Sequence, residues 1–415
     1  MQSTIYTAAS GAAIAAGRRV HSLDVLRGFA LLGILVMNIQ AFAMPMAAYT
    51  NPTVWGDLTG ANFVVWLLSH LLADEKMMAI FSMLFGAGIV LFADRASERG
   101  QSAAGLHYRR HAWLLLFGAA HGYLLWYGDI LFLYAVCGFA IFPLRRLSPR
   151  ALFVIGTAML SVSSLLFLYF GWSLSLWSEA QLADFKAEWD PSPAAVAEEV
   201  AIYRSGWLAQ LPHRAPITAE AQTFVLIVWG FWRAAGLMLI GMALYRLGVL
   251  SGQASNATYW RLVMAALLIG LPLVGYGVVW NFANGWGPES LFIGSQFNYW
   301  GSLPVSLGWV AAVVLLLRHG ALGWLTRRLA AVGRMAFTLY ILQTLIGVFL
   351  FYGQGLALFG QVERTGQMAV VLGIWLLQLL LAPLWLRYFR LGPLEWLWRS
   401  LTYGERQPFR QPTIT

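Results

Sequence analysis

Ionisable side chains inside long apolar runs are the residues of this chain with the most chemical potential. A charged group at mid-membrane depth costs about 2.5 to 3.5 kcal/mol on insertion scales, so it needs a partner or a function. Arg233 is the clearest case, because 12 uncharged residues flank it on each side. Its side chain is too deep to snorkel to the surface. We expect it to face the bundle interior beside a carboxylate, water or an anionic substrate group; a purely structural ion pair is the alternative.

His121 and Asn38 are expected at a similar depth. Each follows an arginine of the cytoplasmic side by 11 residues, Arg110 and Arg27 respectively, which is about 16 Å along a helix. A neutral imidazole there can accept a proton from a hydroxyl or amine, although a histidine satisfied by a backbone carbonyl is equally consistent with the pattern. Asp24, Arg27 and Asn38 fall within about 60° of one another on a helical wheel, so this polar stripe should line a cavity.

Asp129 follows His121 by eight residues and lies at the expected outer tip of a hairpin that turns at 127–129. Along a helix this spacing corresponds to about 12 Å, and it does not require contact between the two side chains. A Gly-Asp pair before a helix is also a common cap. The carboxylate is therefore a candidate catalytic group with a structural alternative.

Residues 61–93 contain a second polar group. A helix of 33 residues would be about 49 Å long, too long for one straight span, and we expect a break near Asp74, Glu75 and Lys76. His70 and Asp74 are spaced i, i+4 on one face. The group could perform acid/base chemistry or bind a cation, but an interfacial salt-bridge patch is at least as consistent, and the spacing predicts no metal site.

The composition requires membrane-spanning helices to position these groups. The chain has 415 residues, of which 59% are hydrophobic and 11% charged, and its mean hydropathy is +0.66. No soluble domain of this size needs so much apolar surface. The one cysteine, Cys137, lies in an apolar run, which excludes a disulfide framework and a cysteine metal site. Residues 1–17 lack the basic start of a cleaved signal peptide.

The expected fold is all-α and polytopic, with about ten transmembrane helices. The apolar runs that predict them are 24–45, 76–93, 111–127, 129–145, 151–175, 221–246, 259–280, 300–318, 333–353 and 366–387. With the N-terminus inside, 21 lysines and arginines fall on the cytoplasmic side and five outside, which predicts that both termini are cytoplasmic. The net charge of +9 is then a topology signal that favours contact with anionic membrane lipids, and no nucleic-acid partner is expected.

Several motifs resemble the YeiB-like family of bacterial inner-membrane proteins, the domain of unknown function 418. They are LDVLRGFALLGILVMN, FSMLFGAGI, HGYLLWYGDILFLYA, GRMAFTLYILQTLI and LGPLEWLWRSLTYG. The resemblance covers residues 22–404 and implies a multi-pass protein of the bacterial inner membrane.

The first helix also resembles, more distantly, that of the transmembrane acyltransferase superfamily, which includes heparan-α-glucosaminide N-acetyltransferase and bacterial sugar O-acyltransferases. The resemblance implies acyl-CoA on the cytoplasmic side and an acceptor hydroxyl or amine on the far side. The sugar O-acyltransferases usually carry a histidine where this chain has Asn38, whereas the heparan enzyme carries asparagine. A catalytic histidine must then come from elsewhere, and His121 and His70 are the candidates.

The resulting organisation has five parts. Residues 1–21 and 405–415 are cytoplasmic tails, 22–175 the acyltransferase-like helices, and 221–404 the C-terminal YeiB-like helices. Residues 176–220 should form short amphipathic helices on the outer face, either as an interfacial cap or as a substrate lid.

Two classes of function remain open, besides a structural or regulatory subunit. In a membrane acyltransferase, His121 would be the general base, and Arg233 or Asn38 would stabilise the oxyanion as the acyl group moves to a small-molecule or lipid-linked sugar or polyol. The CoA phosphates would bind at arginines that are otherwise topology determinants: Arg27, which Asp24 accompanies, and the pairs Arg109-Arg110 and Arg327-Arg328. In a transporter or flippase, Arg233 would instead recognise an anionic substrate, and His121 or the Asp74-Glu75 pair would couple protons.

Overall fold

The computed structural model describes residues 20–411, and these form helices and no β-strand. The expected tail 1–21 therefore falls almost wholly outside the described residues, as do the last four residues of the second tail. The α-helices are α2 (His21–Ala43), α3 (Ala47–Thr50), α4 (Gly60–Leu72), α5 (Lys76–Glu98), α6 (Ala103–Ala120), α7 (Leu131–Ile141), α8 (Pro149–Ser173), α9 (Glu179–Trp189), α10 (Pro193–Tyr203), α11 (Trp207–Glu220), α12 (Phe231–Arg246), α13 (Asn256–Ala265), α14 (Leu271–Ala283), α15 (Ser295–Arg318), α16 (Gly323–Arg334), α17 (Ala336–Phe351), α18 (Arg364–Tyr388) and α19 (Pro393–Tyr403).

The all-helical membrane architecture agrees with the prediction. Among the described residues, seven helical segments are long and apolar enough to cross a membrane, and α16 with α17, bent by 86°, makes a possible eighth. The seven are His21–Ala43, Gly60–Glu98, Pro149–Leu176, Trp207–Arg246, Asn256–Ala283, Ser290–Arg318 and Arg364–Tyr388. The other two expected spans, 111–127 and 129–145, form a hairpin whose second arm is α7. At 11 residues, α7 is about 16 Å long, roughly half of a hydrocarbon core.

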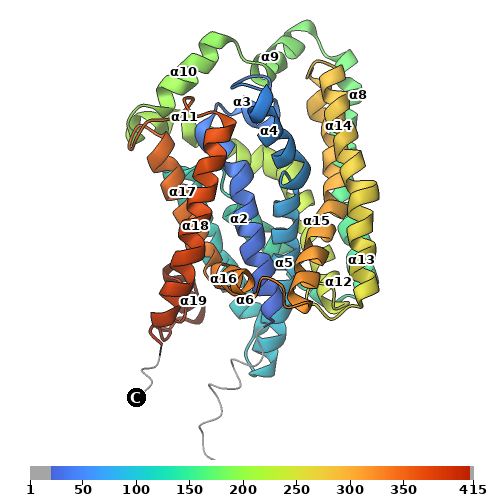
Figure 1. The fold of residues 1–415 in the computed structure, drawn as a ribbon, viewed down its shortest axis with the longest axis vertical. Helices are drawn as coiled ribbons and strands as arrows, with labels where there is room; N and C mark the ends of the chain where they lie inside the picture. The colour runs from blue at the N-terminus through green and yellow to red at the C-terminus, as the bar shows by residue number, and fades with distance from the viewer. Residues whose placement is uncertain (1–19, 412–415) are drawn as a thin grey trace, which may run out of the picture.

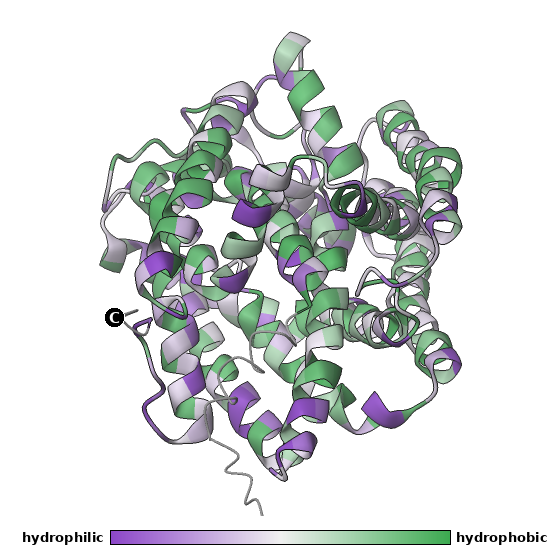
Figure 2. Ribbon diagram, turned by 60° about the horizontal axis from the view of Figure 1, so that its bottom comes forward, coloured by the Kyte–Doolittle hydropathy of each residue, from purple (hydrophilic) through white to green (hydrophobic). Residues whose placement is uncertain are grey.

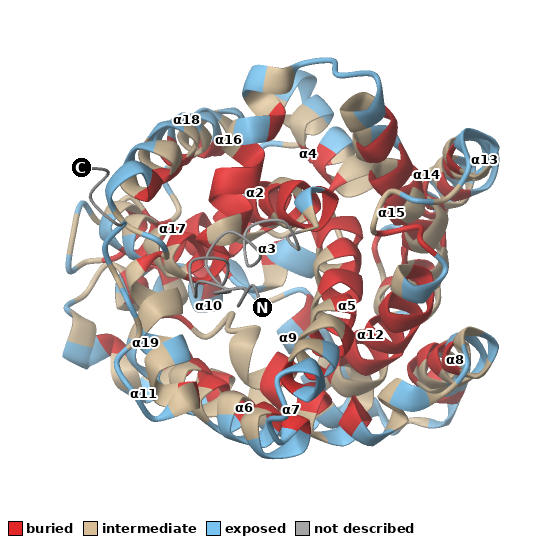
Figure 3. Cartoon of the chain, turned by 90° about the horizontal axis from the view of Figure 1, so that it is seen from below, coloured by how far each residue is buried: buried red, intermediate tan, exposed pale blue. Residues whose placement is uncertain are grey.

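The helices form a bundle with a buried centre and an apolar outer surface. Helices α2, α5 and α12 are buried, whereas α8, α13 and α18 lie at the periphery with exposed outer faces (Figure 3). Hydrophobic residues cover most of the helical ribbon (Figure 2), and large apolar side chains such as Leu165, Leu268 and Leu376 stay exposed on the outer helices. Such a continuous apolar exterior is what lipid contact requires.

Glycines bring the central helices into backbone contact. A Cβ atom added at Gly86 of α5 would lie 1.9 Å from the carbonyl oxygen of Met238 in α12, and one at Gly241 would lie 2.0 Å from that of Met83. At Gly333 of α16, the added atom would lie 1.9 Å from the Asp24 carbonyl oxygen of α2. This close packing of small residues is typical of membrane helices, and it fixes the start of α2 beside α16.

The two ends of the bundle differ. The start of α2, α16 and α19 lie at one end, which we call the α19 end, and α3, α9 and α10 lie at the opposite end, the α10 end (Figure 1). Short helices α9 and α10 occupy part of the expected amphipathic segment 176–220. Its last part, α11, is continuous with a π-helical stretch, Ala221–Gly230, and with α12.

Candidate active site

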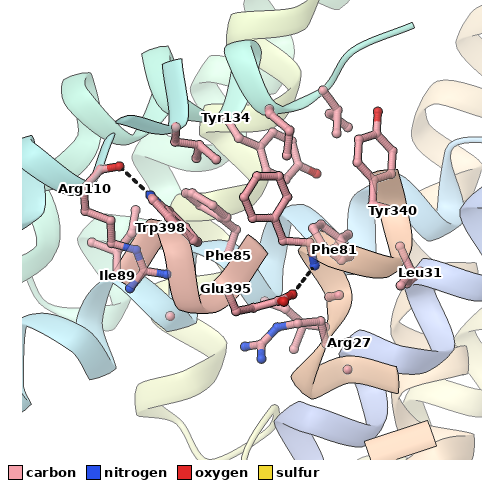
Figure 4. A pocket seen from close by; sticks show the side chains of 18 of the residues that line it. Arg27, Leu31, Phe81, Phe85, Ile89, Arg110, Tyr134, Tyr340, Glu395 and Trp398 are labelled. Atoms are coloured by element: carbon pink, nitrogen blue, oxygen red, sulfur yellow. Dashed lines mark hydrogen bonds between the residues drawn. The ribbon is translucent and has the colours of Figure 1, made fainter. Parts of the chain in front are cut away.

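A cavity opens at the α19 end between α2, α5, α6, α7, α17 and α19. Three arginines and one acid line it: Arg334 and, labelled in Figure 4, Arg27, Arg110 and Glu395. The rest of the lining is mostly apolar and aromatic, namely Leu31, Ile34, Phe81, Leu84, Phe85, Gly88, Ile89, Phe92, His107, His111, Leu114, Ile130, Leu131, Tyr134, Gly333, Ala336, Phe337, Tyr340 and Trp398. A lining that combines arginines with aromatic and aliphatic side chains suits a ligand with an anionic head and an apolar tail.

Aromatic rings hold the guanidinium of Arg110. Its carbon lies 4.1 Å from the centre of the Trp398 ring and 5.0 Å from that of Phe92. The Trp398 Nε1–H also donates to the Arg110 carbonyl at 2.8 Å. Within residues 20–411 this guanidinium makes no hydrogen bond or ion pair. Its N–H donors are therefore oriented by stacking and remain available to an anion. Arg27, by contrast, pairs with Asp24 at 3.2 Å.

Glu395 organises the sharp bend between α16 and α17. Its carboxylate accepts hydrogen bonds from the backbone N–H groups of Phe337 and Thr338 at 2.7 and 3.0 Å, and from the Thr338 hydroxyl at 2.5 Å. These N–H groups belong to the first turn of α17, which would otherwise lack partners. Glu395 thus caps α17 from another helix, and burial raises the pKa of its carboxyl group.

Three helices continue from the cavity to polar side chains deeper in the bundle. Leu31 of α2 and Leu114 of α6 line the cavity. Asn38 lies seven residues after Leu31, and His121 lies seven residues after Leu114. Seven residues bring a helix back to within about 20° of the same direction. On α17, Thr344 lies one turn beyond Tyr340. Asn38 is half-buried although its neighbours on α2 are largely buried. Of the stripe expected to line a cavity, Arg27 does so, whereas Asp24 and Asn38 are not among the lining residues.

His121 is the centre of a buried hydrogen-bonded group. Its Nδ1 lies 2.7 Å from Asp129 Oδ2, its Nε2 lies 2.9 Å from Thr344 Oγ1, and its ring centre lies 5.2 Å from that of Tyr340. The side chains of His121 and Asp129 are only 2% and 1% exposed. Because an ionised carboxylate can only accept, we assign the ring proton to Nδ1, which leaves Nε2 as the basic nitrogen.

The contact of Asp129 with His121 differs from the separation that a straight helix would give. Residues His121–Leu125 form a π-helical turn, after which the chain reverses. A Cβ at Gly118 would lie 2.8 Å from Asp129 Oδ1, so only glycine admits the carboxylate here. The same Oδ1 accepts from the Phe132 N–H at 2.7 Å. Asp129 thus forms the helix cap that the sequence left open as its structural role, and it also contacts His121, which the spacing did not require.

Helix α11 satisfies the backbone of this reversal. The Arg214 guanidinium donates to the Leu125 carbonyl at 2.7 Å, and the Thr218 hydroxyl donates to the Gly122 carbonyl at 3.1 Å. Irregular backbone at membrane depth is tolerated only where protein groups replace the missing helical bonds.

Arg233 lies in a different group of side chains. It is fully buried, and its guanidinium donates to Glu75 Oε2 at 3.2 Å, to the Tyr299 carbonyl at 2.8 Å and to Ser302 Oγ at 2.6 Å. The expected interior position beside a carboxylate is therefore what the structure shows. Among the described residues, no side chain forms a hydrogen bond with both this group and the His121 group. The two groups are therefore separate sites in the bundle.

The predicted break in the segment 61–93 brings further polar groups to Arg233. Helix α4 ends at Leu72, α5 begins at Lys76, and Glu75 between them has a positive φ of 59°. His70 Nδ1 lies 2.9 Å from Asp74 Oδ2, which accepts from the Asn298 amide at 2.9 Å. Lys76 Nζ donates to the His70 carbonyl at 2.7 Å and also to Asn298 Oδ1. These groups largely neutralise one another.

Comparisons with known proteins give the family. A family model described as "Protein of unknown function (DUF418)" matches residues 244–405. "Uncharacterized protein YeiB" of Escherichia coli (strain K12) is 35% identical over 394 residues, which cover 93% of this chain and 97% of the relative. The chain belongs to the YeiB-like family. "Uncharacterized protein YxaH" of Bacillus subtilis (strain 168) is 29% identical over 420 residues, 95% of this chain and 97% of that protein. The family resemblance inferred from the motifs is confirmed.

The remaining predicted residues of this YeiB-like chain are divided between the cavity and its surroundings. Of the arginines predicted to bind CoA, Arg27 and Arg110 line the cavity, whereas Arg109, Arg327 and Arg328 do not.

Sequence reasoning missed Arg334, Glu395, Tyr340 and Thr344. The first three line the cavity, and Thr344 contacts His121. All four lie in the family motifs GRMAFTLYILQTLI and LGPLEWLWRSLTYG, so the signal was present. Their convergence with α2 and α6 depends on the bend at Met335, which apolar periodicity does not reveal.

Proposed function

We propose that this YeiB-like protein is a membrane acyltransferase that moves an acyl group from acyl-CoA to a hydroxyl or amine of a sugar or polyol acceptor. The observation that carries the proposal is the path from three arginines, through an aromatic cavity, to Tyr340, whose ring packs on the buried His121. Phosphates would bind at the arginines by charge-assisted hydrogen bonds, and the acyl-pantetheine arm would fill the cavity.

The proposed orientation places the α19 end in the cytoplasm of a bacterial inner membrane. Support comes from the 21 to five distribution of basic residues and from the cavity, whose arginines lie at the end where cytoplasmic acyl-CoA would arrive. The α10 end then faces outward. The count of ten crossings also belongs to this proposal, with the α6–α7 hairpin as a pair of crossings shortened at its tip.

In the proposed reaction, the acceptor oxygen or nitrogen attacks the thioester carbon. Its proton passes through the Thr344 hydroxyl to His121 Nε2, which Asp129 holds in the basic tautomer. The carbon–sulfur bond then breaks, and the proton moves from His121 to the CoA sulfur. Asn38, on the face that lines the cavity, is the proposed donor to the oxyanion, because Arg233 is already paired with Glu75.

Transfer of radiolabel from acetyl-CoA by purified protein tests this proposal. With polyols and lipid-linked sugars as acceptors, wild-type protein should form labelled product, and His121→Ala should not. The half-buried His70, which is not part of the His121 group, provides the matched histidine control, and His70→Ala should retain activity. Absence of both CoA binding and transfer in folded wild-type protein would reject the proposal.

The second candidate is a transporter or flippase for an anionic substrate. The observation that favours it is the group around Arg233, in which His70, Asp74 and Glu75 meet two buried cations at a helix break. Paired titratable groups at a broken helix are typical of ion-coupled carriers. Substrate uptake by proteoliposomes without CoA would favour this function over the acyltransferase. Folded Arg233→Ala protein should then show no uptake.

A further inference from the structure

A group of buried polar side chains at the α10 end has polar atoms without partners. Arg214, Trp126, Tyr203 and Tyr352 are each at most 2% exposed. Within the described residues 20–411, hydrogen-bond partners are lacking for Arg214 Nε and Nη2, Trp126 Nε1, and the hydroxyls of Tyr203 and Tyr352. Buried polar atoms are nearly always hydrogen-bonded in folded proteins. Five such atoms on four side chains therefore require an explanation.

These four side chains, which we call the Arg214 cluster, lie against one another. The ring centres of Tyr203 and Tyr352 are 4.9 Å apart, and both phenols lie within electrostatic range of the Arg214 guanidinium. That guanidinium bonds the carbonyl of the residue before Trp126. The cluster thus joins α10, α11, the end of α17 and the tip of the α6–α7 hairpin, and its open donors share one small region.

The charge of Arg214 is the unusual feature. Two other arginines are equally buried: Arg233 pairs with Glu75 at 3.2 Å, and Arg364 lies in the field of two carboxylates. Arg214 forms no ion pair among residues 20–411, and its aromatic neighbour Trp207 is 5.9 Å away. A buried cation without a counter-charge is costly. A bound anion would supply both the missing charge and acceptors for the open N–H groups.

The Arg214 cluster adjoins the His121 group on a different side from the cavity. The Trp126 ring centre lies 6.4 Å from that of His121, whereas Tyr340, which lines the cavity, lies 5.2 Å from it. Trp126 Nε1 and the Tyr352 hydroxyl are near each other. His121 therefore contacts an aromatic residue of each region, Tyr340 of the cavity and Trp126 of the Arg214 cluster.

We propose that the Arg214 cluster binds a hydroxyl-bearing ligand with a phosphate or carboxylate group. Arg214 Nε and Nη2 form a fork suited to two oxygens of such a group. The hydroxyls of Tyr203 and Tyr352 and the indole N–H of Trp126 bond its neighbouring oxygens. This inference rests on the proposed function for one point only. If the protein is an acyltransferase, the ligand is the acyl acceptor, and it reaches His121 from the α10 end.

Thermal unfolding of purified protein in phosphate-free detergent, without acyl-CoA, tests the binding. The probes are inorganic phosphate, glucose 1-phosphate and glucuronate; nanodiscs of phosphatidylglycerol, compared with phosphatidylcholine, test a lipid headgroup as the source of the anion. At least one anionic probe should raise the unfolding temperature of the wild type. Arg214→Gln should weaken that binding about tenfold or more, while Lys186→Gln, an exposed charge at the same end, should not.

Tyr352→Phe protects the test against misfolding of Arg214→Gln. It removes a hydroxyl with no hydrogen-bond partner among residues 20–411, so the unliganded protein should unfold close to the wild-type temperature, yet bind the anionic probe more weakly. The proposal is overturned if no anion stabilises the wild type, or if both variants bind as the wild type does.

Failure of this inference is distinguishable from failure of the proposed function. Acyl transfer by wild-type protein that no anionic probe stabilises would overturn the anion site and leave the acyltransferase intact. Anion binding that Arg214→Gln loses, without acyl transfer to any acceptor, would support the site and reject the acyltransferase.

Discussion

Substitution of Asp129 by asparagine tests how the His121 group would operate. The amide has nearly the same size, and its oxygen can still accept from the Phe132 N–H that Asp129 Oδ1 binds at 2.7 Å, so the cap of α7 is kept. The charge-assisted bond to His121 at 2.7 Å is lost, at a cost of about 1.5 to 3 kcal/mol in unfolding free energy. Since the Asp129 side chain is 1% exposed, solvent does not reduce this cost.

The larger effect is expected in the rate. An asparagine NH2 facing Nδ1 donates, which moves the ring proton to Nε2 and removes the basic nitrogen. Transfer from acetyl-CoA should then fall about 10²- to 10⁴-fold, with little change in CoA affinity. Initial rates and CoA titrations on the same preparations measure both, with the exposed Asp184→Asn as the matched control. A loss of rate below about threefold in folded Asp129→Asn would refute the assigned role.

Three further predictions concern the surrounding structure. Gly118→Ala places a Cβ 2.2 Å from the Phe132 nitrogen and should destabilise the protein by about 1 to 3 kcal/mol in denaturant unfolding, whereas Gly373→Ala, with open space around it, should not. Because burial raises the pKa of Glu395 above its ordinary 4.5, the folded state holds a proton that the unfolded state loses. The unfolding temperature should therefore fall as pH rises from about 4.5 through the folded pKa. Glu395→Gln should remove this pH dependence. Arg110→Gln should weaken CoA affinity, measured by calorimetry, about tenfold. Arg327→Gln, outside the cavity, should leave the affinity unchanged. Equal effects of the two substitutions would contradict the assignment of the cavity as the CoA site.

Much of the fold follows from local rules. Apolar runs locate the long spans because about 20 residues are needed to cross the core. The break at Asp74 to Lys76 follows from a segment too long for one span. The interior position of Arg233 follows from its 12 uncharged neighbours on each side. Each of these depends on residues close together in the sequence.

The candidate site is less predictable because its contacts join distant segments. Thr344 is 223 residues from His121, and Glu395 caps an N–H group 58 residues earlier. The contact between Asp129 and His121 depends on a π-helical turn and on the close approach at Gly118. Hydrophobic periodicity assumes a regular helix, so it cannot indicate a contact that exists because the helix is irregular.

A cryo-EM map of the protein with a thioether analogue of acetyl-CoA would test the central claim most directly. The proposed function predicts density for the phosphates beside Arg27, Arg110 and Arg334, with the pantetheine arm in the cavity and the acyl carbonyl within about 3 to 4 Å of the Asn38 or Thr344 side chain. Saturating analogue that leaves the cavity without density, or that binds at the Arg233 group, would contradict it.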